Sequence, residues 1–359
     1  MTTKIRRNED FLMNTHRLTF LFSVIILLLT ICPNLLCWAE GIIVYAYRGT
    51  TYMIRPNDTV PTPTRIAEEG ISTPSPDGRF LAAVDRDPDR RNVLHIRDLR
   101  TGKKIRSIIL QVHSYVDISW SPDGHWIVYA GSSQRIRGGR DVNTEIFLIS
   151  PDGRQKRKLL QPIGEKPIGF VWAPDAQSVF YNLASTDKHQ EIWESNVNGQ
   201  EKPKKHSPFP ERESFLNRYP FYAFSPDGKK IAYTPLHEGV FVADVDGRNH
   251  RQVVNNLDEG IFIVNAGGIK HLEIANRGLR QFFQVDWSPN GEYLVFSADI
   301  GFGNNGLYIY SLASQQVRRL VVLPDSLPIS PRWVGGDSLP VEPLDKKAVT
   351  WGAIKVSRN

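Results

Sequence analysis

The stretch ISWSPDGHWIVYAG, residues 118–131, decides the fold. Alternating apolar side chains run into the turn sequence Ser121-Pro122-Asp123-Gly124, and a second apolar run follows at once. Proline presets the first corner of a type I turn, aspartate hydrogen-bonds to the nearby backbone, and glycine adopts the positive φ that closes the hairpin. The stretch therefore predicts two antiparallel strands joined by a tight turn.

Turns of this kind recur along the whole chain. The residues that directly precede them are Pro74, Trp120, Trp172, Phe224, Trp287 and Trp333, at steps of 46, 52, 52, 63 and 46 residues. Most turns are followed by an apolar strand such as FLAAV (80–84), a second alternating strand, another turn, and a short basic-apolar strand such as RKLL. Four short strands per unit, in six units, are typical of β-propeller blades.

Two sets of repeat residues are expected to have a structural role. The aromatic side chains are large enough to wedge between neighbouring sheets, and the turn carboxylates hold the hairpins. These anchors are Trp120, Trp172, Phe224, Trp287 and Trp333, with Asp77, Asp123 and Asp227 in the turns.

The two ends of the repeat region complement each other. The sequence IVYA at 43–46 is identical to IVYA at 127–130, but no aromatic turn precedes it, so the N-terminus supplies three strands of a blade that lacks its first. The segment SPRWVGGD (330–337) supplies a first strand without clear successors. Joining them removes two exposed edges. We therefore expect an all-β, six-bladed propeller over residues 40–345, after a leader (1–39) and before a tail (346–359) that either competes for the closing strand or caps one face.

The repeat resembles the WD40-like PD40 repeats of the TolB propeller, in its aromatic-Ser-Pro-Asp-Gly turn and the apolar runs that follow. Similar repeats occur in the propellers of the prolyl oligopeptidase and dipeptidyl peptidase IV families. The resemblance covers about residues 42–340 and implies a propeller fold. Those families join an α/β domain to the propeller, whereas here the repeats begin soon after the leader and no G-x-S-x-G motif is present. We expect a propeller without such a partner domain.

The leader indicates export. After the basic residues that end at Arg17, the run LTFLFSVIILLLTI (18–31) is uncharged, and Ala39 stands where a signal peptidase cleaves. A cleaved signal peptide is the expectation, and a signal anchor over residues 18–39 is the alternative; the remainder is then periplasmic or extracellular, with membrane contact only through 18–39. Cys32 and Cys37 both lie in the leader, so cleavage leaves no disulfide and no thiol nucleophile.

Sequence motifs for catalysis or metal binding are weak in this chain. The net charge of +6, part of it in the leader, is too mild to indicate nucleic acid. The GDSL sequence at 336–339 has no histidine after it, and DRDPDRRN (85–92) lacks the glycine and distal glutamate of a calcium loop, which favours a charged loop between two strands. The histidines show no metal-ligand spacing. We therefore expect no catalytic residue, no metal ligand and no cofactor.

The long segments are the expected place for binding. Segments 131–143, 205–222 and the insertion 255–284 exceed the repeat and should lie on the face opposite the turns. The arginines that stand among glycines in 131–143 could bind an anionic group. Arg218 and Tyr219, with Phe221, resemble a contact patch for a partner. The candidates are Arg135, Arg137, Arg140, Arg218, Tyr219, Phe221 and Phe282.

These features predict a monomeric, exported, non-catalytic scaffold that binds a protein or a cell-envelope component. One alternative is a propeller enzyme, a metal-dependent lyase or hydrolase acting on a carbohydrate or small ester at an axial site, which would need three converging histidines or carboxylates. Another is a cell-surface module with a mainly structural role and no saturable ligand.

Overall fold

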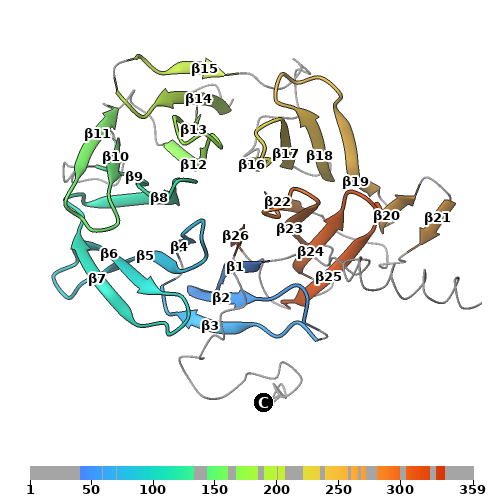
Figure 1. Ribbon diagram of the computed structural model, residues 1–359, viewed down its shortest axis with the longest axis horizontal. Helices are drawn as coiled ribbons and strands as arrows, with labels where there is room; N and C mark the ends of the chain where they lie inside the picture. The colour runs from blue at the N-terminus through green and yellow to red at the C-terminus, as the bar shows by residue number, and fades with distance from the viewer. Residues whose placement is uncertain are drawn as a thin grey trace, which may run out of the picture. The chain divides into compact units, whose positions relative to one another are not determined.

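The computed structural model describes residues 41–58, 60–69, 71–132, 144–160, 167–184, 190–199, 201–206, 221–234, 239–257, 260–265, 268–271, 281–299, 305–323 and 329–335. All secondary structure in these ranges is strand or turn, and the strands form six antiparallel sheets arranged in a ring (Figure 1). The described ranges include no helix with the length and hydropathy that crossing a membrane requires. The expected all-β, six-bladed propeller is confirmed.

Each sheet is one blade, numbered here in chain order. Blade 1 consists of β4 (Ile71–Pro74), β5 (Phe80–Arg86), β6 (Asn92–Asp98) and β7 (Lys104–Ile109). Blade 2 consists of β8 (Ser114–Trp120), β9 (Ile127–Ser132), β10 (Glu145–Ile149) and β11 (Lys156–Leu160). Blade 3 consists of β12 (Pro167–Trp172), β13 (Ser178–Ala184), β14 (Gln190–Asn196) and β15 (Lys204–His206).

The second half of the ring repeats this order. Blade 4 consists of β16 (Phe221–Phe224), β17 (Lys230–Thr234), β18 (Gly239–Asp244) and β19 (Arg251–Leu257). Blade 5 consists of β22 (Gln281–Trp287), β23 (Tyr293–Asp299), β24 (Gly306–Ser311) and β25 (Val317–Val322). Blade 6 has the spatial order β26 (Ile329–Val334), β1 (Ile42–Tyr47), β2 (Thr50–Ile54) and β3 (Thr64–Ala67).

Blade 6 closes the ring with strands from both ends of the repeat region. Its inner strand β26 pairs antiparallel with β1, with Trp333 opposite Ile43. The closure predicted from the incomplete blades at the two ends is confirmed, and β1 gains a partner on each side.

The insertion at 255–284 is only partly a loop. β19 continues to Leu257, and the strands β20 (Gly260–Asn265) and β21 (Gly268–His271) pair after it, so the sheet of blade 4 has six strands. The expectation of one long loop is wrong for these residues, because the alternating GIFIVN and GIKH sequences extend the sheet at its outer edge.

The core lies between the blades. Buried apolar side chains form six clusters, and each cluster draws on two neighbouring blades. In one of them Phe170 and Trp172 of blade 3 pack with Val128 and Leu148 of blade 2. Every blade therefore buries both faces, which explains why its central strands are nearly continuous apolar runs.

The Ser-Pro-Asp-Gly turns satisfy their own polar groups. The Ser121 hydroxyl donates to Asp123 Oδ1 over 2.5 Å, and the same carboxylate oxygen accepts the backbone N–H of His125 over 3.0 Å. Gly124 closes the turn with a φ of 74°. The equivalent turns at Ser75-Asp77 and Ser225-Asp227 make the same serine–aspartate bond.

Candidate functional site

The inner strands of the six blades surround a cavity on the ring axis. The inner-strand residues two positions before the turns line it together with aromatic and proline side chains, and its volume is about 190 Å³. One such residue comes from each blade: Thr73, Ser119, Val171, Ala223, Asp286 and Arg332. These six residues occupy the same position in their strands and lie at one level of the axis. All six inner strands therefore run in the same direction along the axis. The aromatic-Pro turns therefore gather at one face of the ring, the turn face.

A smaller cavity of about 20 Å³ is lined mainly by residues that lie earlier on five of the same strands. Asp117, Gly169, Phe221 and Gln284 belong to its wall, and Arg332 contributes to both cavities. Arg332 thus lies between the two levels, and it influences the carboxylates of Asp117 and Asp286 through its charge.

Asp117 on β8 fastens blade 2 to blade 3. Its carboxylate accepts the backbone N–H of Ile118 over 2.8 Å, and those of Gly169 and Phe170 over 3.1 and 3.3 Å. The last two belong to a bulge in β12, where Gly169 has a φ of 68°. Burial raises the pKa of Asp117, while the charge of Arg332 and the three N–H donors act in the opposite direction.

Asp286 on β22 fastens blade 5 to blade 6 in a related way. Its carboxylate accepts the backbone N–H of Trp333 over 2.8 Å. Burial raises the pKa of Asp286, opposed by Arg332 and by the N–H groups of Trp333 and Trp287. On the same strand the Gln284 side chain accepts the N–H of Ser330.

These contacts give the two axial carboxylates, Asp117 and Asp286, a structural role. Each carboxylate is engaged by backbone donors of the next blade, so both stabilise the ring at its axis. The axial enzyme of the alternative interpretation needs three converging metal ligands. The described axial residues bring two carboxylates and one guanidinium, and the carboxylates do not appear together in any three-ligand group of the described part of the chain.

Most candidate binding residues lie outside the described residues. Arg135, Arg137 and Arg140 fall in 133–143, and Arg218 and Tyr219 fall in 207–220. Phe282 is on β22, and its side chain is also outside the description. Phe221 begins β16, is half-buried and lines the smaller axial cavity.

The repeat aromatics lie between the blades. Trp120, Trp172, Trp287 and Trp333 are each no more than 7% exposed. The Trp172 indole donates to the Ser119 carbonyl of blade 2 over 3.2 Å, and the Trp287 indole donates to the Ala223 carbonyl of blade 4 over 3.0 Å. Phe224, half-buried, packs against Phe180 of blade 3 with ring centroids 5.0 Å apart.

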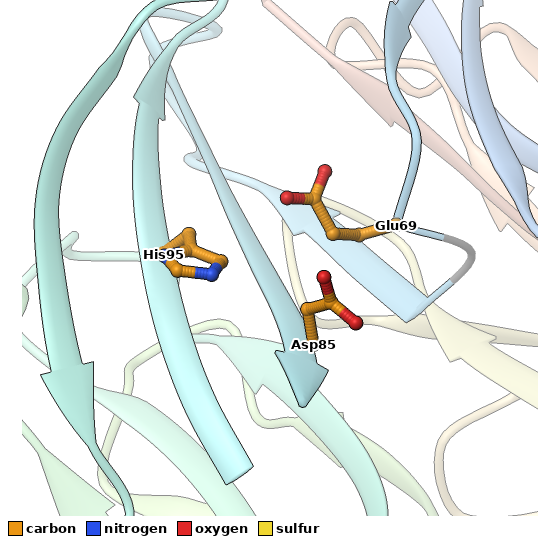
Figure 2. Close-up of side chains that lie close together, drawn as sticks. All are labelled: Glu69, Asp85 and His95. Atoms are coloured by element: carbon orange, nitrogen blue, oxygen red, sulfur yellow. The ribbon is translucent and has the colours of Figure 1, made fainter. Parts of the chain in front are cut away.

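A second polar cluster lies away from the axis, between blades 6 and 1. Glu69, Asp85 and His95 come close together there (Figure 2), and each offers one ligand atom within 4.8 Å of the others. The sequence interpretation missed this cluster. Asp85 belongs to the stretch 85–92, in which Asp87 and Asp89 pair with Arg91, as expected of a charged loop, whereas Asp85 faces the blade interface.

Comparison with known proteins supports the fold. Residues 102–137 match the WD domain, G-beta repeat. No curated protein sequence matches the chain. The structure of TolB from Acinetobacter baumannii is similar over 83% of this chain and 67% of that chain, with 19% identity and a TM-score of 0.54. A chain of the nidogen/laminin complex is similar over 82% of this chain and 98% of that chain, with 13% identity and a TM-score of 0.54. The chain is a TolB-like six-bladed β-propeller in fold.

Proposed function

We propose that this protein is an exported, non-catalytic propeller that binds a protein or cell-envelope component through the face opposite the turns. That face, the connection face, is where β5 and the other second strands end and where each blade is joined to the next. The observation that carries the proposal is the difference between the two faces of the ring.

The hairpins between the first and second strands make the turn face uniform around the axis. Five of its hairpins are the short segments 75–79, 121–126, 173–177, 225–229 and 288–292. Neighbouring turns also pack on one another: a Cβ added at Gly124 would lie 3.9 Å from Pro76, and one at Gly228 would lie 3.5 Å from Pro174. Such turns have little freedom to differ from blade to blade.

The connection face carries the larger variation in length. The segments that join the strand ends there range from Arg48-Gly49 between β1 and β2 to 207–220 between β15 and β16. Segment 133–144, with Arg135, Arg137 and Arg140, joins the ends of β9 and β10 that lie at this face. Recognition in rigid scaffolds is concentrated in such segments, because they can change without disturbing the core.

Site-specific photo-cross-linking in intact cells tests which face binds. A photoreactive residue is placed at Asp89 or His113 on the connection face and, as matched controls, at His125 or Lys229 on the turn face; all four are exposed. We expect one adduct of reproducible mass from the connection face only. The adduct's partner is then purified, and its affinity for a chain with Arg135, Arg137 and Arg140 changed to alanine is measured against the unchanged chain.

Three results would contradict the proposal. Adducts confined to the turn face would assign binding to the opposite surface. No adduct from either face, with the protein folded and in its usual compartment, would favour the structural module. Cell fractionation that places the chain with cytoplasmic proteins would contradict export.

A further inference from the structure

Glu69, Asp85 and His95 come from three different elements of the interface between blades 6 and 1 (Figure 2). Glu69 lies in the connection between β3 and β4, Asp85 near the end of β5, and His95 in the middle of β6. In the register of blade 1, Asp85 is opposite Val93 and His95 is opposite Ala83. Asp85 and His95 are therefore diagonal neighbours on one face of the sheet.

Glu69 is held at this place by the adjoining blade. The buried Thr51 hydroxyl of β2 donates to the Glu69 carbonyl oxygen over 2.5 Å. The Glu69 residue is only 6% exposed, and its Oε1 accepts a hydrogen bond of 2.5 Å from Arg97. Lys104 Nζ lies 3.5 Å from the same oxygen.

The remaining acceptor positions of the cluster point to a cation-binding site. Glu69 Oε2 is buried and has no hydrogen-bond partner. A buried acceptor without a partner is costly, so native structures rarely contain one. His95 Nδ1 shares a hydrogen bond of 2.9 Å with Ser107 Oγ, which leaves Nε2 available. Asp85 Oδ1 accepts the N–H of Arg86 over 2.7 Å, which leaves Oδ2 available as a cation ligand.

We propose that Glu69, Asp85 and His95 bind one divalent transition-metal ion, with Zn²⁺ as the best match. Two carboxylates and one imidazole suit zinc, whereas Ca²⁺ and Mg²⁺ prefer oxygen ligands alone. Ligands about 2.1 Å from a tetrahedral ion lie roughly 3.4 Å apart. The separations of up to 4.8 Å thus require only a small inward shift, which the exposed Asp85 allows.

The surroundings define the kind of site. The Ser107 hydroxyl would orient the His95 ring from behind, as outer partners of metal-bound histidines do. Because Asp85 is exposed, water completes the coordination on that side. Arg97 and Lys104 oppose the positive charge of the ion, so its affinity is lower than that of a site without them. The ion would link blade 6, the blade that closes the ring, to blade 1.

Zinc titration of the full chain tests the proposal. The chain carries Cys32→Ser and Cys37→Ser, because thiolates of the leader bind zinc independently. After treatment with a chelator, ZnCl₂ is titrated by calorimetry, and CoCl₂ is added separately to record visible absorption. We expect one saturable zinc site per chain, a cobalt spectrum that zinc abolishes, and a rise in Tm with zinc that CaCl₂ does not produce.

Variants assign the site to these residues. Asp85→Asn should weaken zinc binding at least about tenfold, whereas Asp89→Asn, an equal charge change at an exposed loop position, should leave it unchanged. His125→Ala removes the exposed histidine beside Asp123 and should also have no effect. Lys104→Met should strengthen binding several-fold, because it removes the ammonium beside Glu69.

The proposal is overturned if the chelator-treated chain shows no saturable zinc binding while it remains folded. It is also overturned if Asp85→Asn binds zinc as tightly as the unchanged chain. Both outcomes would identify the cluster as an ion-pair network between the two blades.

Discussion

The indole N–H of Trp172 donates a 3.2 Å hydrogen bond to the backbone carbonyl of Ser119, which lies on the inner strand of the preceding blade. Trp287 makes the equivalent bond to Ala223. Trp172 and Trp287 therefore do more than fill the space between blades, because each also joins two inner strands by a hydrogen bond.

Trp172→Phe should test the contribution of this hydrogen bond between blades 2 and 3. The substitution keeps an aromatic ring but removes the donor, and the Ser119 carbonyl oxygen loses a buried partner. We expect a loss of about 1–3 kcal/mol in the free energy of unfolding, measured by urea denaturation. Trp120→Phe is the matched control, since the Trp120 indole bonds over 3.2 Å to Gly124 in its own, partly exposed turn. A cost for the control equal to that for Trp172→Phe would contradict a role specific to the blade interface.

The difference between contacts within one repeat and contacts between blades decides what the sequence could predict. The aromatic and its Ser-Pro-Asp-Gly turn are adjacent in sequence, so their repetition reveals blades, blade number and the closing strand. Asp117 is different: its partner Gly169 is 52 residues away, in a bulge of the next blade. Asp85 and His95 meet only through strand register, and Glu69 joins them from another connection. Contacts of this kind depend on blade packing, which local patterns do not encode.

Asp117→Asn should reveal the function of the axial carboxylate. An amide offers one acceptor oxygen where the carboxylate serves three N–H donors, so we expect a loss of about 1–3 kcal/mol. The folded pKa of Asp117 is raised by burial above its unfolded value of about 3.9. The aspartate's contribution to stability is then complete below that unfolded value and decreases as pH rises through the folded pKa. The cost of the substitution should accordingly be larger near pH 4 than at pH 8, in urea unfolding at both values.

Asp123→Ala should show the opposite dependence on pH. Burial tends to raise the pKa of Asp123, but bonds from Ser121 and His125 outweigh it, so the folded pKa is lowered. Its contribution is present above the unfolded pKa and disappears as pH falls through the folded one. The side chain is 41% exposed, so screening limits the cost to about 1 kcal/mol or less at pH 7. Thermal unfolding of the unchanged chain and of Asp123→Ala at pH 7 and pH 3 measures this cost. An equal or larger cost at pH 3 would contradict this assignment.

Two glycines with positive φ should differ sharply when changed to alanine. Gly239 has a φ of 112°, and a Cβ there would lie 2.0 Å from the Val254 carbonyl oxygen. Gly199 has a φ of 70°, but its Cβ would meet nothing within 4 Å. We expect Gly239→Ala to cost more than about 2 kcal/mol and Gly199→Ala about 1 kcal/mol, by urea denaturation. Equal costs would show that β18 and β19 can separate at this point without loss.

Ring closure makes the strongest prediction. Val44 on β1 pairs with Met53 on one side and Arg332 on the other, so proline there removes a donor from a central strand. An unpaired seam would also leave edges open to other chains. We expect Val44→Pro to give aggregated or protease-sensitive protein. Ile105→Pro is the control, because Ile105 is the unpaired residue of a bulge in the outer strand β7 and is 54% exposed. Size-exclusion chromatography and limited proteolysis compare the two. If Val44→Pro remained monomeric and protease-resistant, the pairing of β1 with β26 would not be what holds the ring closed.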